Sequence, residues 1–365
     1  MCLPPPPPSV SSIKLKIYYI VDVDVDVDVV FTQSLSLIPT IMYITPVITN
    51  FSIYGIYEHY ITTHPGANTG LIHRTMYFPH QDDREVARIV ARYSRFIILI
   101  QQNEYAVGCF QRDIQPHIHA ANKPYIIISC MDDFTFPETV VGSFFDMCPS
   151  PLFRHWFAAN CRVRIPTEYA KITPIPYGID YWTLAARTSW TNTPTASACI
   201  QDRHLSKLRE SVIHFSRRVD TRIYINFQFN LDGNGGAERF AAFHTIPRDV
   251  MSIQESPVNR YDTWGAYTQH AFVASPRGNG LDTIRTWEAL MLGCIVIVRR
   301  IPGATAIEEL YTDLPVVVVD RWSDLSRDFL VRILSEYSQR TFNYAKLTTE
   351  YWTCRINDAF DDVRI

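Results

Sequence analysis

The sequence predicts an α/β fold built from two Rossmann-like, doubly wound domains. Short runs of apolar, mostly β-branched residues are typical of parallel strands that are buried on both faces: residues 96–100, 124–129, 294–298 and 315–319. Helical patterns lie between such runs, and this alternation indicates a parallel sheet. A chain of 365 residues is long enough for two domains that each bury a core.

Composition places the chain among globular proteins and narrows its partners. Hydrophobic residues make up 47% and charged residues 19%, and the net charge of -3 gives no electrostatic case for binding nucleic acid. The eight cysteines form no C-x-x-C pair, which argues against a structural zinc site and gives little support to a disulfide framework. Cys130 and Cys294 lie in or beside apolar runs and are expected to be buried thiols. The cysteine spacing favours a reducing, cytoplasmic compartment and leaves the Golgi or another endomembrane compartment open.

The most informative stretch is residues 271–293, where a strand, a glycine-rich loop and a helix follow one another. Asp282 is expected to cap the helix, because its carboxylate can accept backbone N–H groups of the first turn. Gly293 suits the left-handed turn that closes a helix. In the loop, residues 278–280 allow backbone N–H groups to approach a ligand, so this is a natural place for phosphate oxygens.

Charged side chains near this loop fit the same interpretation. Arg277 and Arg285 would supply positive charge and forked donors, and Glu288 could accept hydrogen bonds from sugar hydroxyls. The alternative is purely structural, since strand–glycine–helix turns are common and an Arg/Glu pair three residues apart is often a surface ion pair. Spacing alone leaves both interpretations open. A second glycine cluster, residues 233–236, is interpreted as a strand-to-helix turn because no cationic side chain immediately precedes it.

These residues also resemble a known family. Residues 275–282 read Ser-Pro-Arg-Gly-Asn-Gly-Leu-Asp and residues 285–290 read Arg-Thr-Trp-Glu-Ala-Leu, and both are similar to the C-terminal half of exostosin-like glycosyltransferases, which have the GT-B fold. The resemblance continues through residues 293–298 and 313–322. It implies two domains facing each other across a cleft, with a nucleotide-sugar donor in the second. The donor-binding residues that it implies are Ser275, Arg277, Gly278, Asn279, Gly280, Asp282, Arg285 and Glu288, the last on the ribose.

Five segments are expected along the chain. Residues 1–50 contain a polyproline run and a Val-Asp repeat, and they are interpreted as a flexible, low-complexity arm. A signal-anchor in the uncharged residues 29–57 is the alternative, but Pro39 and Pro46 interrupt it, so membrane association has weak support. The other segments are an acceptor-side domain, a linker, a donor domain and a final helix that packs back on the first domain: residues 51–182, 183–206, 207–340 and 341–365.

The first domain is expected to hold the acceptor. Shorter and looser similarity to the same glycosyltransferases covers several elements between residues 123 and 180. One is the loop after the strand 124–129, and ligands of open α/β sheets bind at such carboxyl ends. Asn160 and Tyr177 are expected to line the acceptor side, with a structural role as the alternative for each.

A carboxylate in that loop is the expected catalytic base. Asp133 is the first candidate to take the proton of the acceptor hydroxyl, and Asp132 is the second. His117 and His119, which precede the strand, are less favoured candidates for the base. A solvated turn is the commoner role for loop aspartates and stays the alternative.

The expected function is metal-independent, inverting transfer of a hexosyl or pentosyl group from a nucleotide-sugar to a glycan or glycoconjugate. The resemblance implies that basic side chains and helix N-termini, rather than a metal ion, stabilise the departing diphosphate. No cofactor is expected besides the nucleotide-sugar. The alternatives are an inactive GT-B scaffold that binds a glycan or protein partner, and a nucleotide-dependent enzyme such as an epimerase on the same fold.

Overall fold

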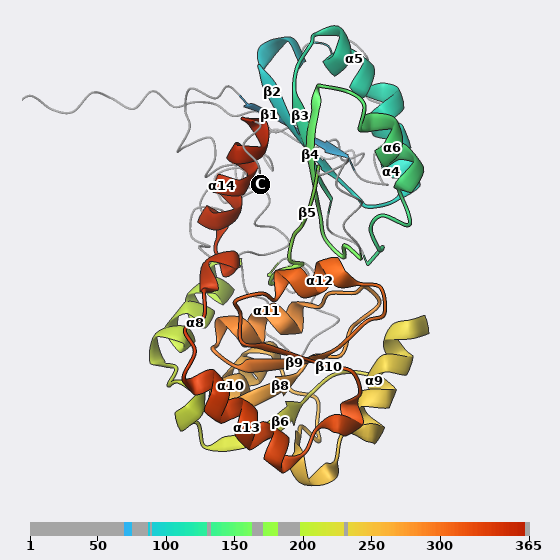
Figure 1. The fold of residues 1–365 in the computed structure, drawn as a ribbon. Coiled ribbons are helices and arrows are strands. Elements are labelled where there is room, and N and C mark those ends of the chain that lie inside the picture. Colours follow the sequence, from blue (N-terminus) through green and yellow to red (C-terminus); the bar gives the residue numbers. More distant parts are fainter. Residues whose placement is uncertain are drawn as a thin grey trace, which may run out of the picture.

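The computed structural model describes residues 69–74, 87, 90–129, 133–162, 171–181, 198–229 and 233–361. The expectations for the arm 1–50, for Cys130, for Asp132 and for most of the linker lie outside these residues. The described chain forms two five-stranded parallel sheets, which lie one above the other in Figure 1 with helices packed on both. It is therefore an α/β protein with two Rossmann-like domains.

The N-terminal sheet keeps its strands in chain order: β1 (Thr69–Arg74), β2 (Arg95–Ile100), β3 (Tyr125–Ser129), β4 (Phe153–Ala158) and β5 (Ile172–Pro174). Successive residues of β2 and β3 belong to two different cores, as the alternation of side chains along a strand requires. One face carries α4 (Glu104–Asp113), α5 (Gln115–Ala120) and α6 (Val141–Met147). The other face is covered by the last helix, α14 (Thr349–Phe360), which lies against β3 and β4 (Figure 1).

The C-terminal sheet has the order β10-β9-β8-β6-β7. Its strands are β6 (Asp220–Ile225), β7 (Met251–Ile253), β8 (His270–Ala274), β9 (Ile295–Arg299) and β10 (Val316–Val319). One face carries α9 (Gly233–Thr245) and α13 (Arg327–Ser338), and the other carries α10 (Arg260–Gln269), α11 (Ile284–Met291) and α12 (Thr305–Leu310). The winding reverses between β6 and β8, and doubly wound sheets bind ligands outside the carboxyl ends of strands at such a reversal.

The buried strands confirm the sequence prediction closely. The predicted strands at 96–100, 124–129, 294–298 and 315–319 are β2, β3, β9 and β10, each within a residue or two of the expected bounds. Cys294 is fully buried, as expected. Gly293 follows the end of α11 with a φ of 70°, which confirms its left-handed closing role.

Two helix caps differ from the prediction. The side chain that caps α11 is Thr283, which accepts from the backbone N–H of Arg285, and not Asp282, whose carboxylate is engaged elsewhere. The sequence also predicts that Trp322 and Ser323 begin a helix that runs to about Tyr337. These two residues lie instead in a 3-10 turn, η5 (Trp322–Asp324), and Ser326 caps α13 by accepting from the N–H of Phe329 at 3.1 Å. In both places two polar residues compete within one turn, and packing decides between them.

Part of the predicted linker is helical. The helix α8 (Ala198–Ser211) begins inside the segment 183–206. Leu205 is 1% exposed and packs in the same core as residues of the second sheet, so its burial stabilises a helix within the segment that was expected to be a linker. The remaining short turns are η3 (Phe215–Arg217), η4 (Arg248–Val250) and η6 (Tyr344–Leu347).

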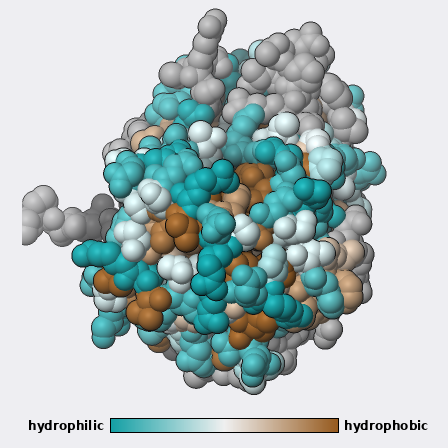
Figure 2. Space-filling model, turned by 60° about the horizontal axis from the view of Figure 1, so that its bottom comes forward, coloured by the Kyte–Doolittle hydropathy of each residue, from teal (hydrophilic) through white to brown (hydrophobic). Residues whose placement is uncertain are grey.

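The described surface offers no membrane-spanning element. Of the helices in the described ranges, none is both long and apolar enough to cross a bilayer. The end of the C-terminal domain turned forward in Figure 2 shows hydrophobic residues in small, separate patches among hydrophilic ones. The uncharged segment 29–57 lies outside the described residues.

Candidate functional site

The carboxyl edges of the two sheets meet where the loop after β4 touches the loop after β8. Oδ1 of Asn160 accepts a hydrogen bond from the backbone N–H of Asp282 at 2.9 Å. A Cβ atom on Gly280 would lie 2.7 Å from the side-chain amide of Asn160, so any larger residue there would displace that amide. The backbone N–H of Tyr177, beyond β5, donates to Oδ2 of Asp282 at 2.8 Å. The residues expected on the acceptor side, Asn160 and Tyr177, therefore contact the expected donor loop directly.

Asp282 is a buried carboxylate that joins the two domains. Besides the Tyr177 contact, its Oδ2 accepts from indole Nε1 of Trp287 at 2.7 Å, and its Oδ1 accepts from the N–H of Thr283 at 2.7 Å. The residue is 4% exposed, and burial raises the pKa of its carboxyl from 3.8 to about 6 although the three hydrogen bonds oppose the shift. Both oxygens are engaged within the protein, so the side chain ties the glycine loop to the first domain.

Two glycine segments pack against each other at the reversal between β6 and β8. A Cβ atom on Gly235, in the first turn of α9, would lie 2.3 Å from the carbonyl oxygen of Gly278 and 3.0 Å from the backbone nitrogen of Asn279. Only glycine allows this backbone-to-backbone contact. The interpretation of residues 233–236 as a strand-to-helix turn is therefore incomplete. They form the first turn of α9, and this turn packs against the loop 277–280.

Arg239, which the sequence analysis did not single out, lies beside this contact. It is 9% exposed, its Nε donates to the carbonyl oxygen of Arg277 at 3.3 Å, and its Nη1 donates to that of Gln228 at 3.0 Å. Burial, followed by the like charge of Arg285, lowers the pKa of its guanidinium to about 10, while Asp133 opposes the shift. The sequence does hold a signal for Arg239, because it lies one helical turn after Gly235. That signal was missed because only cationic residues that precede the glycines at 233–236 were considered.

Arg285 approaches the same region from the first turn of α11. Its Nε donates to Oδ1 of Asn226 at 3.2 Å, and its guanidinium carbon lies 5.7 Å from the ring centroid of Phe227. Both partners follow β6, so the side chain spans the reversal between β6 and β8. Together Arg239 and Arg285 bring two like charges within electrostatic range of each other beside the glycine loop. Such a region favours an anion.

Glu288 is already ion-paired in this structure. Its Oε1 accepts from Nε of Arg260 at 2.8 Å and also from Nη2 of the same guanidinium, and both residues are buried. Arg260 also donates to Oε1 of Gln201 at 3.2 Å and to the carbonyl oxygen of Asp180. Glu288 does not pair with Arg285. Arg260 is the first residue of α10, where a positive charge is unfavourable because it opposes the helix dipole. A cation at such a position indicates a partner such as Glu288.

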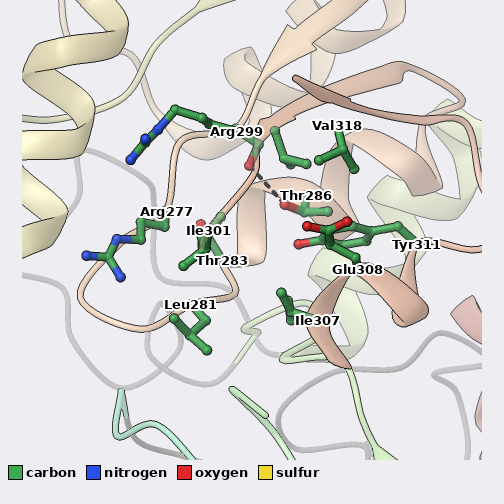
Figure 3. Close-up of a pocket in the computed structure, with 12 residues that line it drawn as sticks. Arg277, Leu281, Thr283, Thr286, Arg299, Ile301, Ile307, Glu308, Tyr311 and Val318 are labelled. Carbon is green, nitrogen blue, oxygen red and sulfur yellow. Dashed lines mark hydrogen bonds between the residues drawn. The ribbon is translucent and has the colours of Figure 1, made fainter. Parts of the chain in front are cut away.

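A small cavity lies between the start of α11 and α12, at the carboxyl ends of β8, β9 and β10 (Figure 3). Its volume is about 20 Å³, room for one water-sized group. Ser275 and Thr286 line it, and their hydroxyl groups hydrogen-bond to each other at 2.9 Å. The Ser275 hydroxyl is therefore held against the first turn of α11.

Arg277 borders this cavity, yet its guanidinium turns away from it, as does that of Arg299 (Figure 3). Within the described part of the chain, the Arg277 guanidinium makes no hydrogen bond or ion pair. Burial lowers its pKa, Glu238 opposes this shift, and the like charges of Arg162 and Arg299 add to it. Arg277 and Arg285, which were expected to act on one phosphate site, thus have different neighbours.

The candidate bases differ in position. Asp133 is exposed after the carboxyl end of β3 and lies within electrostatic range of Arg239 in the other domain. His117 and His119 lie in α5, which leads into the amino end of β3 and sits at the far end of the domain (Figure 1). That position removes both histidines as candidates, whereas the role of Asp133 stays a prediction.

Potential metal ligands are scattered in the described structure. Among the described residues, no three His, Cys, Asp or Glu side chains lie close enough together to hold a metal ion. Asp132, the second candidate for the base, lies outside this set.

Comparison with known proteins gives structural likeness only. Neither a scan of protein families nor a search of curated proteins finds a match. Among solved structures, an α,α-trehalose 6-phosphate synthase from Burkholderia multivorans is 10% identical, with a TM-score of 0.36 over 77% of this chain and 76% of that one. A UDP-forming α,α-trehalose-phosphate synthase from Burkholderia xenovorans is 11% identical, with a TM-score of 0.34 over 85% and 82%.

A structure from E. coli described as trehalose-6-phosphate bound with UDP-2-fluoro glucose is 12% identical, with a TM-score of 0.33 over 77% of this chain and 74% of that one. At such low TM-scores and identities, the fold class rests on the chain's own two parallel sheets.

Proposed function

We propose that the protein is a glycosyltransferase that moves a sugar from a nucleotide-sugar to a glycan or glycoconjugate. The observation that carries the proposal is the pair Arg239 and Arg285 beside two interlocked glycine segments, at the winding reversal of the second sheet. A doubly wound sheet binds nucleotides at this point, and the diphosphate of a nucleotide-sugar needs fixed positive charge and backbone N–H groups. The exostosin-like pattern of residues 275–298 supports the same assignment at the level of sequence.

The arginines have a chemical role in this proposal. The oxygen of an acceptor hydroxyl forms a bond to the anomeric carbon while the bond from that carbon to the diphosphate oxygen breaks. The electron pair of the breaking bond stays on the departing diphosphate, and Arg239 and Arg285 stabilise the charge that develops there. The hydroxyl proton passes to a carboxylate on the first domain, for which Asp133 is the proposed base. Attack from the face opposite the leaving group inverts the anomeric carbon.

Glu288 and Arg260 would hold the nucleoside end of the donor. Both contacts of Arg260 with this carboxylate use Oε1, and no described residue donates to Oε2. Arg260 therefore fixes the carboxylate in one orientation while the second oxygen can accept from ribose hydroxyls. This arrangement is proposed for a side chain that is 5% exposed, so the ribose would have to enter a narrow site.

Nucleotide binding by the full chain tests the proposal. We expect one nucleotide-sugar of a UDP-, GDP- and CMP-sugar panel to bind and to be slowly hydrolysed. Arg239→Ala and Arg285→Ala should each raise the Kd for this nucleotide-sugar by about 10- to 150-fold. This factor corresponds to the loss of about 1.5 to 3 kcal/mol, which is typical of a hydrogen bond to a charged group. Arg332→Ala removes an exposed arginine from α13 and should leave the affinity unchanged.

Failure of every nucleotide and nucleotide-sugar to bind a folded protein would remove the proposal. Tight donor binding without hydrolysis or transfer to any acceptor would instead support the inactive scaffold. The two results are separable because binding is measured by titration calorimetry and turnover by release of the free nucleotide.

A further inference from the structure

A second groove opens on the other side of the Arg277 side chain, between α9 and the turn η5. Its volume is about 470 Å³, within the range of small-molecule sites. We propose that this groove binds a phosphorylated sugar or a similar small polyhydroxyl phosphate, separately from the nucleotide-sugar. The site goes beyond the proposed transferase function, because its ligand would not be the donor.

The groove exists because one stripe of α9 carries small side chains. Ala237, Ala241 and Thr245 recur every four residues, so they share one face of the helix and line the groove. No large side chain of α9 fills the space between this face and Trp322. The exposed Phe240 of the same helix points elsewhere, since it is 58% exposed and does not line the groove.

The floor of the groove is rigid. Glu238 accepts from Nε of Arg299 at 2.8 and 2.9 Å and from its Nη2, and indole Nε1 of Trp322 donates to Oε1 of the same carboxylate at 2.7 Å. These hydrogen bonds join three elements, α9, β9 and η5, at the floor of the groove. A site that is already ordered loses little conformational entropy when a ligand binds.

The positive charge beside the groove is only partly balanced by the chain. Glu238 is ion-paired with Arg299 and also lies within electrostatic range of Arg277, so one carboxylate serves two guanidinium groups. Arg277 itself makes no hydrogen bond or ion pair among the described residues, and Arg162, the other like charge in range, is paired with Glu138. The guanidinium groups of Arg277 and Arg299 both point away from the small cavity, and both line the groove (Figure 3). An anion bound at Arg277 would balance the positive charge that Glu238 leaves uncompensated, and it would use forked donors that suit phosphate oxygens.

The groove also offers groups that recognise hydroxyls. Asp320 and Ser323 line it and are exposed, and Oδ1 of Asp320 accepts from Nε of Arg300 at 2.8 Å. Arg321 lines the groove as well, but Asp324 neutralises it at 2.8 Å. Positive charge at Arg277 together with hydroxyl-binding side chains matches a sugar that carries a phosphate group, which would lie with the phosphate against Arg277.

Titration calorimetry of the full chain tests this assignment. The probes are glucose 6-phosphate, inorganic phosphate, glucuronic acid and glucose. We expect glucose 6-phosphate to bind at least tenfold more tightly than each of the other three. Arg277→Ala should weaken that binding at least tenfold by removing the unbalanced charge, and Ala241→Phe should abolish it by filling the groove.

Two further measurements separate this site from the donor site. Val331→Phe adds the same ring to an exposed position of α13, 62% exposed, and should leave glucose 6-phosphate binding unchanged. The nucleotide that binds at Arg239 and Arg285 should bind Ala241→Phe as tightly as it binds the unmodified protein. If that nucleotide failed to bind at all, the proposed function would fall while the groove could still pass its own test.

The inference is overturned if no phosphorylated probe binds the folded protein. It is also overturned if Ala241→Phe and Arg277→Ala bind glucose 6-phosphate as tightly as the unmodified protein does. Equal or tighter binding of glucuronic acid would also overturn it, since the charge would then select a carboxylate. Competition between glucose 6-phosphate and the nucleotide for a single site would overturn it as well, because the groove would then belong to the donor site.

Discussion

Replacing Asp282 by Asn should change the way stability depends on pH. The carboxyl is buried, and its pKa is raised from 3.8 to about 6. The native state therefore binds a proton more tightly than the unfolded chain does. Asp282 adds stability that is fully present well below pH 3.8, and this stability is lost as the pH rises from about 3.8 through 6. A shift of about two pKa units corresponds to about 3 kcal/mol, since one unit is about 1.4 kcal/mol.

The substitution Asp282→Asn removes this titration but keeps one oxygen that can accept from Tyr177 and Trp287. The lost hydrogen bond to the N–H of Thr283 costs the same free energy at every pH, so it cancels when the pH dependence is compared. We expect the free energy of unfolding of the variant, relative to the unmodified protein, to rise by about 2 kcal/mol between pH 4.5 and pH 7.5, because about a third of the full difference is already present at pH 4.5. Tyr311, the nearby group that feels the Asp282 charge, stays neutral in this range because burial raises its pKa.

Urea denaturation at pH 4.5, 5.5, 6.5 and 7.5 measures this difference. Asp249→Asn, at an exposed position in η4, is the matched control and should give a difference that does not vary with pH in the same way. A difference for Asp282→Asn that stayed constant within about 0.5 kcal/mol would refute the reasoning. The carboxylate would then be hydrated or paired in a way that its contacts do not show.

Three more substitutions test contacts of the described structure. Gly280→Ala should destabilise the protein by about 1 to 3 kcal/mol because its Cβ would overlap the Asn160 amide, and Asn160→Gly should relieve part of that cost in a double-mutant cycle. Arg218→Met should cost about 3 kcal/mol or more in urea denaturation, since its guanidinium serves backbone carbonyls near the ends of α10 and α11 that would lose their partner. Arg260→Met should cost about 3 to 5 kcal/mol by leaving the Glu288 carboxylate buried without its cation, and Glu288→Gln in the same background should recover much of it. A loss below about 1 kcal/mol in any of the three would contradict the contact concerned.

The sequence predicts the sheets well and the loops less well, for a physical reason. A run such as residues 294–298 is apolar at every position because a parallel strand is buried on both faces. This requirement acts within a single short segment, so the sequence of that segment is enough to predict the strand. The partner of Asp282 is not local. Tyr177 is more than a hundred residues away, and only the folded chain brings its N–H to that carboxylate in place of the N–H groups of α11.

The candidate site shows the same division between local and distant information. Arg277 and Arg285 are close in sequence and were placed in one site, but their neighbours come from different strands: Arg285 contacts Asn226 after β6, and Arg277 lies near Arg299 at the end of β9. Arg239 was missed because its significance depends on Gly235 meeting Gly278. Residue types indicated the chemistry, whereas the grouping of those residues required the fold.

The glycine loop is fixed from two sides before any ligand binds. Gly235 meets it from α9, and Asn160 meets it from the first domain through the N–H of Asp282. The first contact joins backbone to backbone with no room for a Cβ, and the second is a hydrogen bond to the Asn160 side chain, so a shift of the loop would break one of them. A loop held in this way keeps its N–H groups in place at little entropic cost on binding. The same contacts connect the two domains, so whatever binds beside Arg239 and Arg285 is held by a loop whose position the acceptor-side domain helps to set.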